Sequence, residues 1–316
     1  MLSRIDPMVR LLALAIGLAL VLPVQGAARD LAQFVANAAV FLLFFLNGLR
    51  LPRHEVRAGI GNHRLLWPLV GWVFGGMGVA GWLLWQGGQG WMPPLLALGF
   101  LYLGCLPSTV QSATAYSSLA GGNVASSVVA AALLNILGVF ITAPLFSLLA
   151  GSGAAAFHAE GLIKVVTILL IPFLLGQALQ GRLGQWVAGH RQLVTRMDRT
   201  SIAIAVYVAF SGAVAQRFWE RIDLAGWLWL AGGTALFLIF GHLGAWLAGG
   251  SVGLDRPNRV SFLFAGAQKS IAMGAPLATV LFPPAAAGIV LLPILLYHLV
   301  QLVIAAPIAA RLNPPG

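Results

Sequence analysis

The stretch GAQKSIAMGAP, residues 266–276, places a lysine in the middle of a strongly apolar segment, Val260 to Phe282. Lys269 lies about twelve residues from either end of the helix expected there, on the order of 18 Å at 1.5 Å per residue. A lysine side chain does not reach that far to water, and a lysine at mid-bilayer depth costs a few kcal/mol. The glycines and the proline around it predict an interrupted helix. A costly charge beside a break in a helix indicates a functional site.

The composition as a whole indicates a membrane protein. The chain is 59% hydrophobic and 8% charged, whereas ordinary soluble domains are about 25% charged. Apolar runs near the length that a helix needs to cross a bilayer recur from end to end, which predicts an all-α polytopic membrane protein. The formal charge of +10 does not indicate nucleic-acid binding, because basic residues accumulate in the cytoplasmic loops of membrane proteins. We therefore expect the lipid bilayer, and no nucleic acid, as a partner.

Ten membrane spans are expected from the apolar runs between charged or glycine- and proline-rich breaks. They are residues 8–25, 31–49, 64–86, 91–120, 123–149, 160–180, 199–216, 224–249, 258–282 and 285–310. If the N-terminus is cytoplasmic, thirteen of the arginines fall in cytoplasmic segments and three fall outside. This asymmetry follows the positive-inside rule, so we expect both termini in the cytoplasm of a bacterial cell, with the chain in its inner (plasma) membrane.

The ten expected spans divide into two halves of five. The polar stretch Gly151–Glu160 separates residues 1–150 from residues 151–316. Because each half holds an odd number of spans, the second half must run inverted relative to the first. Inverted repeats are typical of secondary transporters, which build their sites where broken helices meet near the midplane.

The fourth span of each half carries the unusual residues. In the first half it reads GCLPSTVQSATAYSS, residues 104–118, and in the second half it contains Lys269. Pro107 removes a backbone donor and clashes with the preceding turn, so a break is predicted in each fourth span. Backbone groups that a break frees are tolerated at this depth only where protein or water covers them. Half-helix N-termini favour anions and C-termini favour cations, which makes a transport site that needs no cofactor.

These residues also carry a resemblance to a known family. LPSTVQS (106–112), GNVASS (122–127) and GAQKS (266–270) resemble the fourth, fifth and ninth helices of the bile acid:sodium symporter superfamily. Together with FLNGLRLPRHEV (45–56), they resemble its sodium/bile acid cotransporter 7-like (SBF-like) branch. The resemblance covers essentially the whole chain.

The resemblance implies a fold with crossed, broken helices 4 and 9. Helices 1, 2, 6 and 7 would form a panel, and helices 3–5 and 8–10 a core domain, with the substrate between panel and core and sodium behind the crossing. It also implies the substrate- and ion-binding residues. These are Pro107, Thr109, Gln111, Ser112, Asn123, Ser127, Gln268, Lys269 and Ser270, with sodium possible near Gln111, Ser112, Ser127 and Gln268.

The coupling ion is where the sequence departs from that family. The family's sodium-binding glutamate corresponds to Phe264, and all eight acidic residues lie in loops or at the ends of spans. Sodium prefers oxygen ligands with negative charge, so the sequence argues against conventional sodium coupling. The Lys269 ammonium would take the place of the bound cation and donate to oxygens of Gln111, Ser112 or Asn123. Burial disfavours a charged lysine, so coupling to a proton is also open, as is a lysine that only pins the crossed helices.

The expected function is secondary active transport of a small organic anion by alternating access. The motivation is an interior that carries Lys269 and helix dipoles but no buried carboxylate. Two alternatives stay open: a cation/proton antiporter, and a non-transporting regulator of ion homeostasis or envelope biogenesis. An enzyme is not expected, because an intramembrane aspartyl hydrolase would need buried carboxylates. The oligomeric state, monomer or homodimer, is open. Asn135 would face the crossing or a neighbouring helix. His242, His298 and Gln301 are expected to be packing residues, with a proton relay as the alternative.

Overall fold

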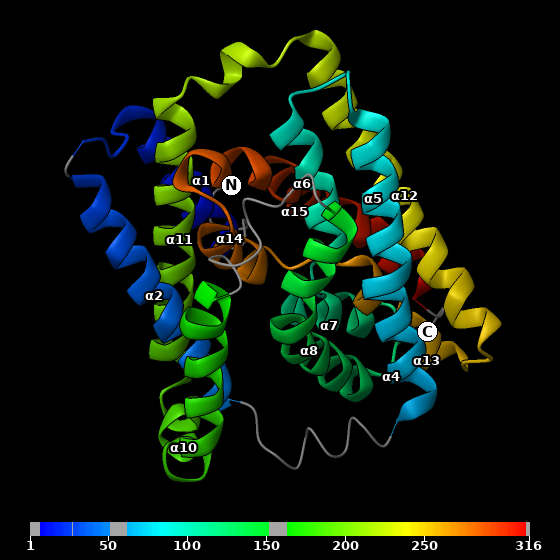
Figure 1. Cartoon of the computed structure of the whole chain (residues 1–316). Helices are drawn as coiled ribbons and strands as arrows, with labels where there is room; N and C mark the ends of the chain where they lie inside the picture. The colour runs from blue at the N-terminus through cyan, green and yellow to red at the C-terminus, as the bar shows by residue number, and fades with distance from the viewer. Residues whose placement is uncertain (1–6, 27, 51–61, 152–162, 314–316) are drawn as a thin grey trace. The chain divides into compact units, whose positions relative to one another are not determined.

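The computed structural model describes residues 7–26, 28–50, 62–151 and 163–313, and it is built from helices (Figure 1). The longer elements of the first part are α1 (Pro7–Val21), α2 (Ala28–Arg50), α4 (His63–Val70), η2 (Gly71–Gly76), α5 (Met77–Gly88), α6 (Pro94–Cys105), α7 (Val110–Leu119) and α8 (Val124–Ala150). Those of the second part are η4 (Val166–Leu170), α10 (Ile171–Gly189), α11 (Arg191–Ala215), α12 (Leu224–Ser251), α13 (Arg256–Ala267), α14 (Ile271–Leu281) and α15 (Pro284–Leu312).

Within the described residues, six helices are long and apolar enough to cross a membrane. The helices α6 and α7, bent by 61° at a short break, pass the same test together and give a seventh span if the pair is counted as one. These helices confirm the prediction of an all-helical, multi-pass integral membrane protein. The count of ten spans stays a prediction, because α1 has only 15 residues and α13 and α14 are short. The helix α11 (expected span 199–216) is not among the six, and its first two turns carry the charged residues Arg191, Arg196 and Asp198.

Local sequence accounts for where several helices begin. The Asp223 side chain accepts a hydrogen bond from Gly226 N at 2.8 Å, and Asn123 accepts one from Ser126 N at 3.1 Å, so α12 and α8 begin with side-chain caps. Such caps satisfy backbone donors that a helix start leaves free. Prolines occupy the first turns of α6 and α13, where the missing N–H has no partner to lose.

The chain forms two compact units, which we call unit 1 and unit 2. Unit 1 comprises Met1–Pro52, Ser152–Ile222 and Gly274–Leu291. In it α2 packs against α10 and α11, and α11 packs against α1 (Figure 1). Arg50, the last residue of α2, forms an ion pair with Asp198. Asp198 was expected at the end of a span, but it lies inside α11 and is largely buried.

Glycine lets α2 and α10 approach closely in unit 1. A Cβ atom added to Gly176 would lie 2.2 Å from the carbonyl oxygen of Phe45, and one added to Gly48 would lie 2.3 Å from the carbonyl oxygen of Phe173. Small residues at helix contacts allow this kind of backbone approach in membrane proteins.

Unit 2 comprises Arg53–Gly151, Asp223–Met273 and Leu292–Gly316. In it α5 packs against α6 and α12, α7 against α8, and α13 against α7, α8 and α12. Its buried apolar side chains include Leu69, Phe262 and Phe264. All nine of the predicted site residues belong to this unit.

We expect Gly176→Ala to destabilise the protein by about 1–3 kcal/mol, the cost typical of forcing an extra methyl group into a packed contact. The atom it would meet is a backbone carbonyl oxygen, which cannot rotate away. A thermal unfolding scan in detergent measures the effect. Gly181→Ala, on the same helix with nothing within 4 Å of the added Cβ, is the matched control and should not lower the melting temperature. Equal melting temperatures for the two variants would contradict the close approach.

Candidate functional site

Two breaks in the helices of unit 2 organise the site. Leu106 to Thr109 separate α6 from α7, and Gln268 to Ser270 separate α13 from α14. Leu106 and Gln268 are extended, with ψ of 149° and 135°. The first break follows from Pro107, because a residue before proline is pushed out of the helical region. Both breaks lie where the sequence predicts them.

The two breaks are hydrogen-bonded to each other. Ser270 N donates to the Pro107 carbonyl at 3.1 Å, and Thr109 Oγ1 donates to the Lys269 carbonyl at 2.8 Å. Ser112 Oγ, in the first turn of α7, donates to Gln268 Oε1 at 2.8 Å. Groups that an unbroken helix would pair internally therefore find partners in the opposite break, as backbone buried in a membrane requires.

Helix α15 holds the second break from another side. Gln301 is fully buried; its Oε1 accepts from Lys269 N at 2.8 Å, and its Nε2 donates to the Lys269 carbonyl at 3.0 Å. The side-chain amide of Gln301 thus pairs with both the N–H and the carbonyl of Lys269, as a neighbouring backbone strand would. Tyr297 donates its hydroxyl hydrogen to the Ala267 carbonyl at 2.7 Å. Gln301 was expected to be a packing residue, yet it contacts the site directly.

The Lys269 ammonium is surrounded by backbone carbonyls. The side chain is 1% exposed. Its Nζ donates to the carbonyl oxygens of Leu106 at 2.7 Å, Gly104 at 2.9 Å and Val73 at 3.0 Å. An ammonium has three donors, so each of them is used. The expectation that Lys269 would donate to Gln111, Ser112 or Asn123 is wrong, because the acceptors are main-chain oxygens of other segments.

Each of these three carbonyls is free for a local reason. Gly104 and Leu106 lie at the C-terminal end of α6, where carbonyls have no partner in the next turn and where the helix dipole favours a positive charge. Val73 lies in η2, a π-helical segment. There Met77 N donates to the Trp72 carbonyl, one residue farther back than in an α-helix, and so the Val73 carbonyl does not receive it.

Two of the nine predicted residues lie away from the lysine. Gln111 is exposed on α7. Asn123 caps α8 and donates from Nδ2 to Asn258 Oδ1 at 3.1 Å, while its own N–H donates to the Pro257 carbonyl at 3.0 Å. Asn123 therefore joins α8 to the start of α13 and takes no part in holding the ammonium.

Ser127, whose implied role is that of a sodium ligand, is hydrogen-bonded to another hydroxyl group. Its Oγ lies 3.1 Å from Ser117 Oγ, and both side chains are fully buried. Its bonding partner is therefore a residue outside the predicted set. The six remaining predicted residues, Pro107, Thr109, Ser112, Gln268, Lys269 and Ser270, contact one another across the two breaks.

Several residues that the sequence reasoning did not place at the site are brought to it. Val73 contributes a carbonyl that no sequence motif marks. The glycines of GWVFGG in η2 are only a weak signal of an irregular helix there. Gln301 braces Lys269. Asn135, for which two positions were open, donates from Nδ2 to the Ser108 carbonyl at 2.8 Å and so contacts the first break.

Polar groups remain unused beside the breaks. Ser108 Oγ and Gln268 Nε2 are buried and have no hydrogen-bond partner within the described residues.

The charge of the ammonium is not balanced by a carboxylate at the site. Among the described residues, the buried acidic side chain is that of Asp198, in unit 1. The ammonium is thus stabilised by dipoles and not by a carboxylate. Chemically, the site is a fixed cation within a shell of oxygens, at the meeting point of two interrupted helices.

Apolar spans interrupted by polar, mutually bonded segments are the architecture of a membrane transporter. A sequence profile of the SBF-like CPA transporter family matches residues 6–314. The chain belongs to this family, within the bile acid:sodium symporter superfamily. The family prediction from the sequence is confirmed.

Individual relatives agree with this assignment. The protein named "Putative symporter YfeH" of Escherichia coli K12 is 33% identical, over 97% of this chain and 92% of its own length. The proteins named "Sodium/bile acid cotransporter 7" of Rattus norvegicus and Danio rerio are each 21% identical, over 85% of this chain and 80% and 81% of their own lengths. The chain is therefore similar to transporters along nearly its whole length.

We expect Lys269→Met to destabilise the protein by about 2–4 kcal/mol, because three buried carbonyls lose their donors and an unpaired buried polar group costs about 1–3 kcal/mol. Thermal or denaturant unfolding in detergent measures the change. The control is Lys164→Met, which removes the chain's other lysine from an exposed position. A Lys269→Met protein as stable as the control would show that the ammonium does not hold the two breaks together.

Proposed function

We propose that this protein is a secondary active transporter that moves a small organic anion across the bacterial inner membrane by alternating access. The observation that carries the proposal is the Lys269 ammonium held by the carbonyls of Val73, Gly104 and Leu106. It is a positively charged group attached to the chain at the point where solute and ion sites form in transporters with broken helices. The names of the relatives, a symporter and bile acid cotransporters, support an anionic organic solute.

We further propose that the ammonium replaces the metal cation that other members of the superfamily bind. Carbonyl oxygens in a membrane protein take over the hydration shell of a metal ion, and here a lysine occupies such a shell. Phe264, at the position that matches the family's glutamate, is fully buried, with its ring 5.7 Å from that of Tyr116. It offers a metal ion no ligand. We therefore expect transport that does not depend on sodium and that is driven by a proton gradient or by the solute's own gradient.

The proposed architecture is that of ten helices in two inverted repeats, residues 1–150 and 151–316. Helices 1, 2, 6 and 7 would form the panel, and helices 3–5 and 8–10 the core domain, with helices 4 and 9 broken and crossed. Support comes from unit 1, which contains α1, α2, α10 and α11, and from unit 2, which contains both breaks. Unit 1 also includes Gly274–Leu291, which covers most of α14 and the start of α15 and which this architecture assigns to the core domain. Alternating access needs two bodies that can move as wholes, and two compact units meet that need.

The arginine distribution supports cytoplasmic N- and C-termini. Thirteen arginines fall on one side of the ten proposed spans and three on the other, and an excess of basic residues marks the cytoplasmic side. Arg311 near the end of α15 belongs to the basic side.

A cation/proton antiporter is the weaker candidate. Such a protein needs a titratable group that can exchange a proton for a cation, and a membrane carboxylate is the usual choice. Within the described residues the buried carboxylate is that of Asp198, which is paired with Arg50 in unit 1. A non-transporting regulator is the second alternative, and an uptake measurement separates it from a transporter.

The cation-replacement proposal predicts that sodium binding can be restored. The double variant Phe264→Glu/Lys269→Asn removes the ammonium and adds a carboxylate at the position that matches the family's glutamate. We expect its melting temperature to be higher in sodium chloride than in choline chloride. Sodium at about 100 times its dissociation constant would add about 2.7 kcal/mol. The unaltered protein and Lys269→Asn alone should melt at the same temperature in both salts. A sodium effect on the unaltered protein would contradict the proposal.

Uptake into proteoliposomes tests transport itself. Labelled taurocholate, octanoate and succinate cover a steroid, a fatty and a short dicarboxylic anion. We expect accumulation of at least one of them, driven by an imposed proton gradient or by the solute's own gradient and indifferent to sodium. Lys269→Ala should abolish it. The Gly181→Ala protein is the control for reconstitution. Uptake that requires sodium, or that survives Lys269→Ala unchanged, would refute the role given to the lysine, and no uptake of any of the three would favour the regulator.

A further inference from the structure

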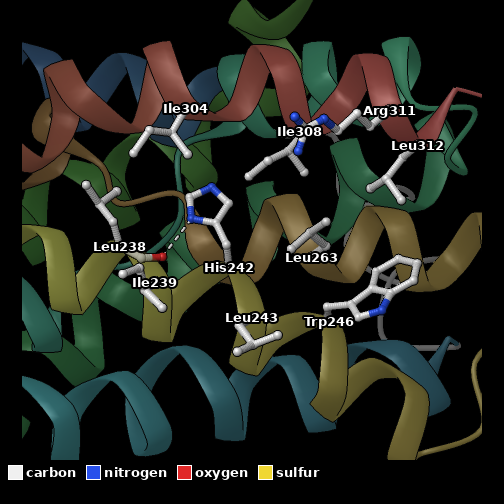
Figure 2. A pocket seen from close by; sticks show the side chains of 10 residues that line it. All are labelled: Leu238, Ile239, His242, Leu243, Trp246, Leu263, Ile304, Ile308, Arg311 and Leu312. Atoms are coloured by element: carbon white, nitrogen blue, oxygen red, sulfur yellow. Dashed lines mark hydrogen bonds between the residues drawn. The ribbon is translucent and has the colours of Figure 1, made fainter.

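A groove on unit 2 lies apart from the two breaks. It has a volume of about 430 Å³ and is lined by residues of α12, α13 and α15, as Figure 2 shows. Its walls are aliphatic, for example Leu238 on α12, Leu263 on α13 and Ile304 on α15. None of its lining residues holds the Lys269 ammonium.

The outer edge of the groove belongs to the membrane-facing surface. Ile239 and Leu243, which line it, are 61% and 56% exposed, and Leu236 and Leu247 on the same helix are 58% and 57% exposed. α12 is one of the six helices long and apolar enough to span a membrane. Apolar side chains exposed on such a helix face acyl chains, so the bilayer itself supplies the molecule that enters the groove.

One end of the groove is basic. Arg311 lines it beside Leu312, near the C-terminal end of α15 (Figure 2). The Arg256 guanidinium donates to the Leu312 carbonyl, and the Arg259 guanidinium lies 3.9 Å from the centre of the Trp246 ring. The carboxylate at this end is Asp255, which accepts a hydrogen bond from Asn258. Among the described residues, three arginines against one aspartate leave an excess of positive charge where the groove ends.

A buried histidine, His242, lines the groove between its membrane-facing edge and its basic end. His242 is 6% exposed, and its Nδ1 lies 2.9 Å from the Leu238 carbonyl. A carbonyl only accepts, so the hydrogen is on Nδ1 and Nε2 is an acceptor. Nε2 has no partner within the described residues, and the ring stands opposite Ile304 and Ile308 of α15 (Figure 2). This orphaned acceptor marks the groove as a place for a ligand with a polar portion, not for a hydrocarbon alone.

We propose that the groove binds one anionic phospholipid of the surrounding leaflet. An acyl chain lies between α12 and α15, and the phosphate contacts Arg311. Ile304 and Arg311 are seven residues apart, about 10 Å along α15. His242 thus lies below the phosphate, at the depth of the glycerol backbone and the first chain carbons. There Nε2 accepts a hydrogen bond from a lipid hydroxyl or from a water bridging to an ester. Basic pockets between membrane helices are known to bind anionic headgroups in this way.

Trp246 lines the groove and provides the measurement. The full-length protein is reconstituted in bilayers that contain phosphatidylglycerol or phosphatidylcholine with the same brominated chains, since bromine quenches tryptophan on contact. The difference between the unaltered protein and Trp246→Phe isolates the emission of Trp246. We expect it to be quenched at lower mole fractions of brominated phosphatidylglycerol than of brominated phosphatidylcholine. One arginine should give a preference of about fivefold, which corresponds to about 1 kcal/mol per basic residue.

Two variants and one control decide the outcome. Arg311→Gln should remove the preference for phosphatidylglycerol, and Ile304→Phe, which fills the groove, should weaken quenching by both lipids. Arg182→Gln removes an exposed arginine from α10 and should change neither. Equal quenching by the two lipids in the unaltered protein, or a preference that survives Arg311→Gln, would overturn the proposal. Neither result depends on transport, so this test is separate from that of the proposed function.

Discussion

A break in a membrane helix and a buried ammonium each leave polar groups without water, and in this protein each provides the partners of the other. Taking an ammonium out of water costs several kcal/mol unless hydrogen bonds replace its hydration, and each orphaned buried carbonyl costs about 1–3 kcal/mol. The three carbonyls around Lys269 meet both requirements at once. The rest of unit 2 serves this arrangement: α7 bonds to the second break, α15 braces it through Gln301, and α8 reaches the first break through Asn135.

The proposed replacement of a metal ion by Lys269 would set this protein apart from sodium-coupled members of its superfamily. A metal ion in an oxygen shell can leave, and its departure is what couples an ion gradient to movement of a solute. A lysine in a comparable shell is attached to the chain and stays. If the ammonium replaces the metal ion, as proposed above, it preserves the charge at the two breaks and removes the exchange, so that the broken helices are held without sodium. The absence of a ligand at Phe264 is consistent with this difference.

The sequence predicts the places where the helices break but not all of the partners that hold them. Pro107 and the glycines around Lys269 have local effects on the backbone, and local effects are visible in a sequence. Thr109, Ser112 and Ser270 follow because they flank the breaks. Gln111 does not contact the breaks, for a geometric reason: it is adjacent to Ser112 on α7, and neighbouring residues on a helix do not face the same way. Only Ser112 is turned toward Gln268.

The remaining misses have a different origin. Asn123 has a residue type that is as well suited to capping a helix as to binding an ion, and the sequence does not distinguish these uses. The Val73 carbonyl is invisible to motif reasoning, because every residue has a carbonyl and only the backbone path decides which one is free. Gln301 is 32 positions from Lys269 in the chain, so their contact depends on how α15 packs.

The π-helical segment η2 affects both the burial of side chains along α4 and α5 and the Val73 carbonyl at the site. The buried residues from α4 through α5 include Leu65, Leu69, Val73, Met77 and Gly81, a stripe with a constant step of four. An α-helix turns once in 3.6 residues, so such a stripe drifts around a regular helix by about 40° per step. The wider turn of η2 offsets part of this drift between Leu69 and Met77. The same wider turn leaves the Val73 carbonyl without the Met77 N–H and so makes it available to the ammonium.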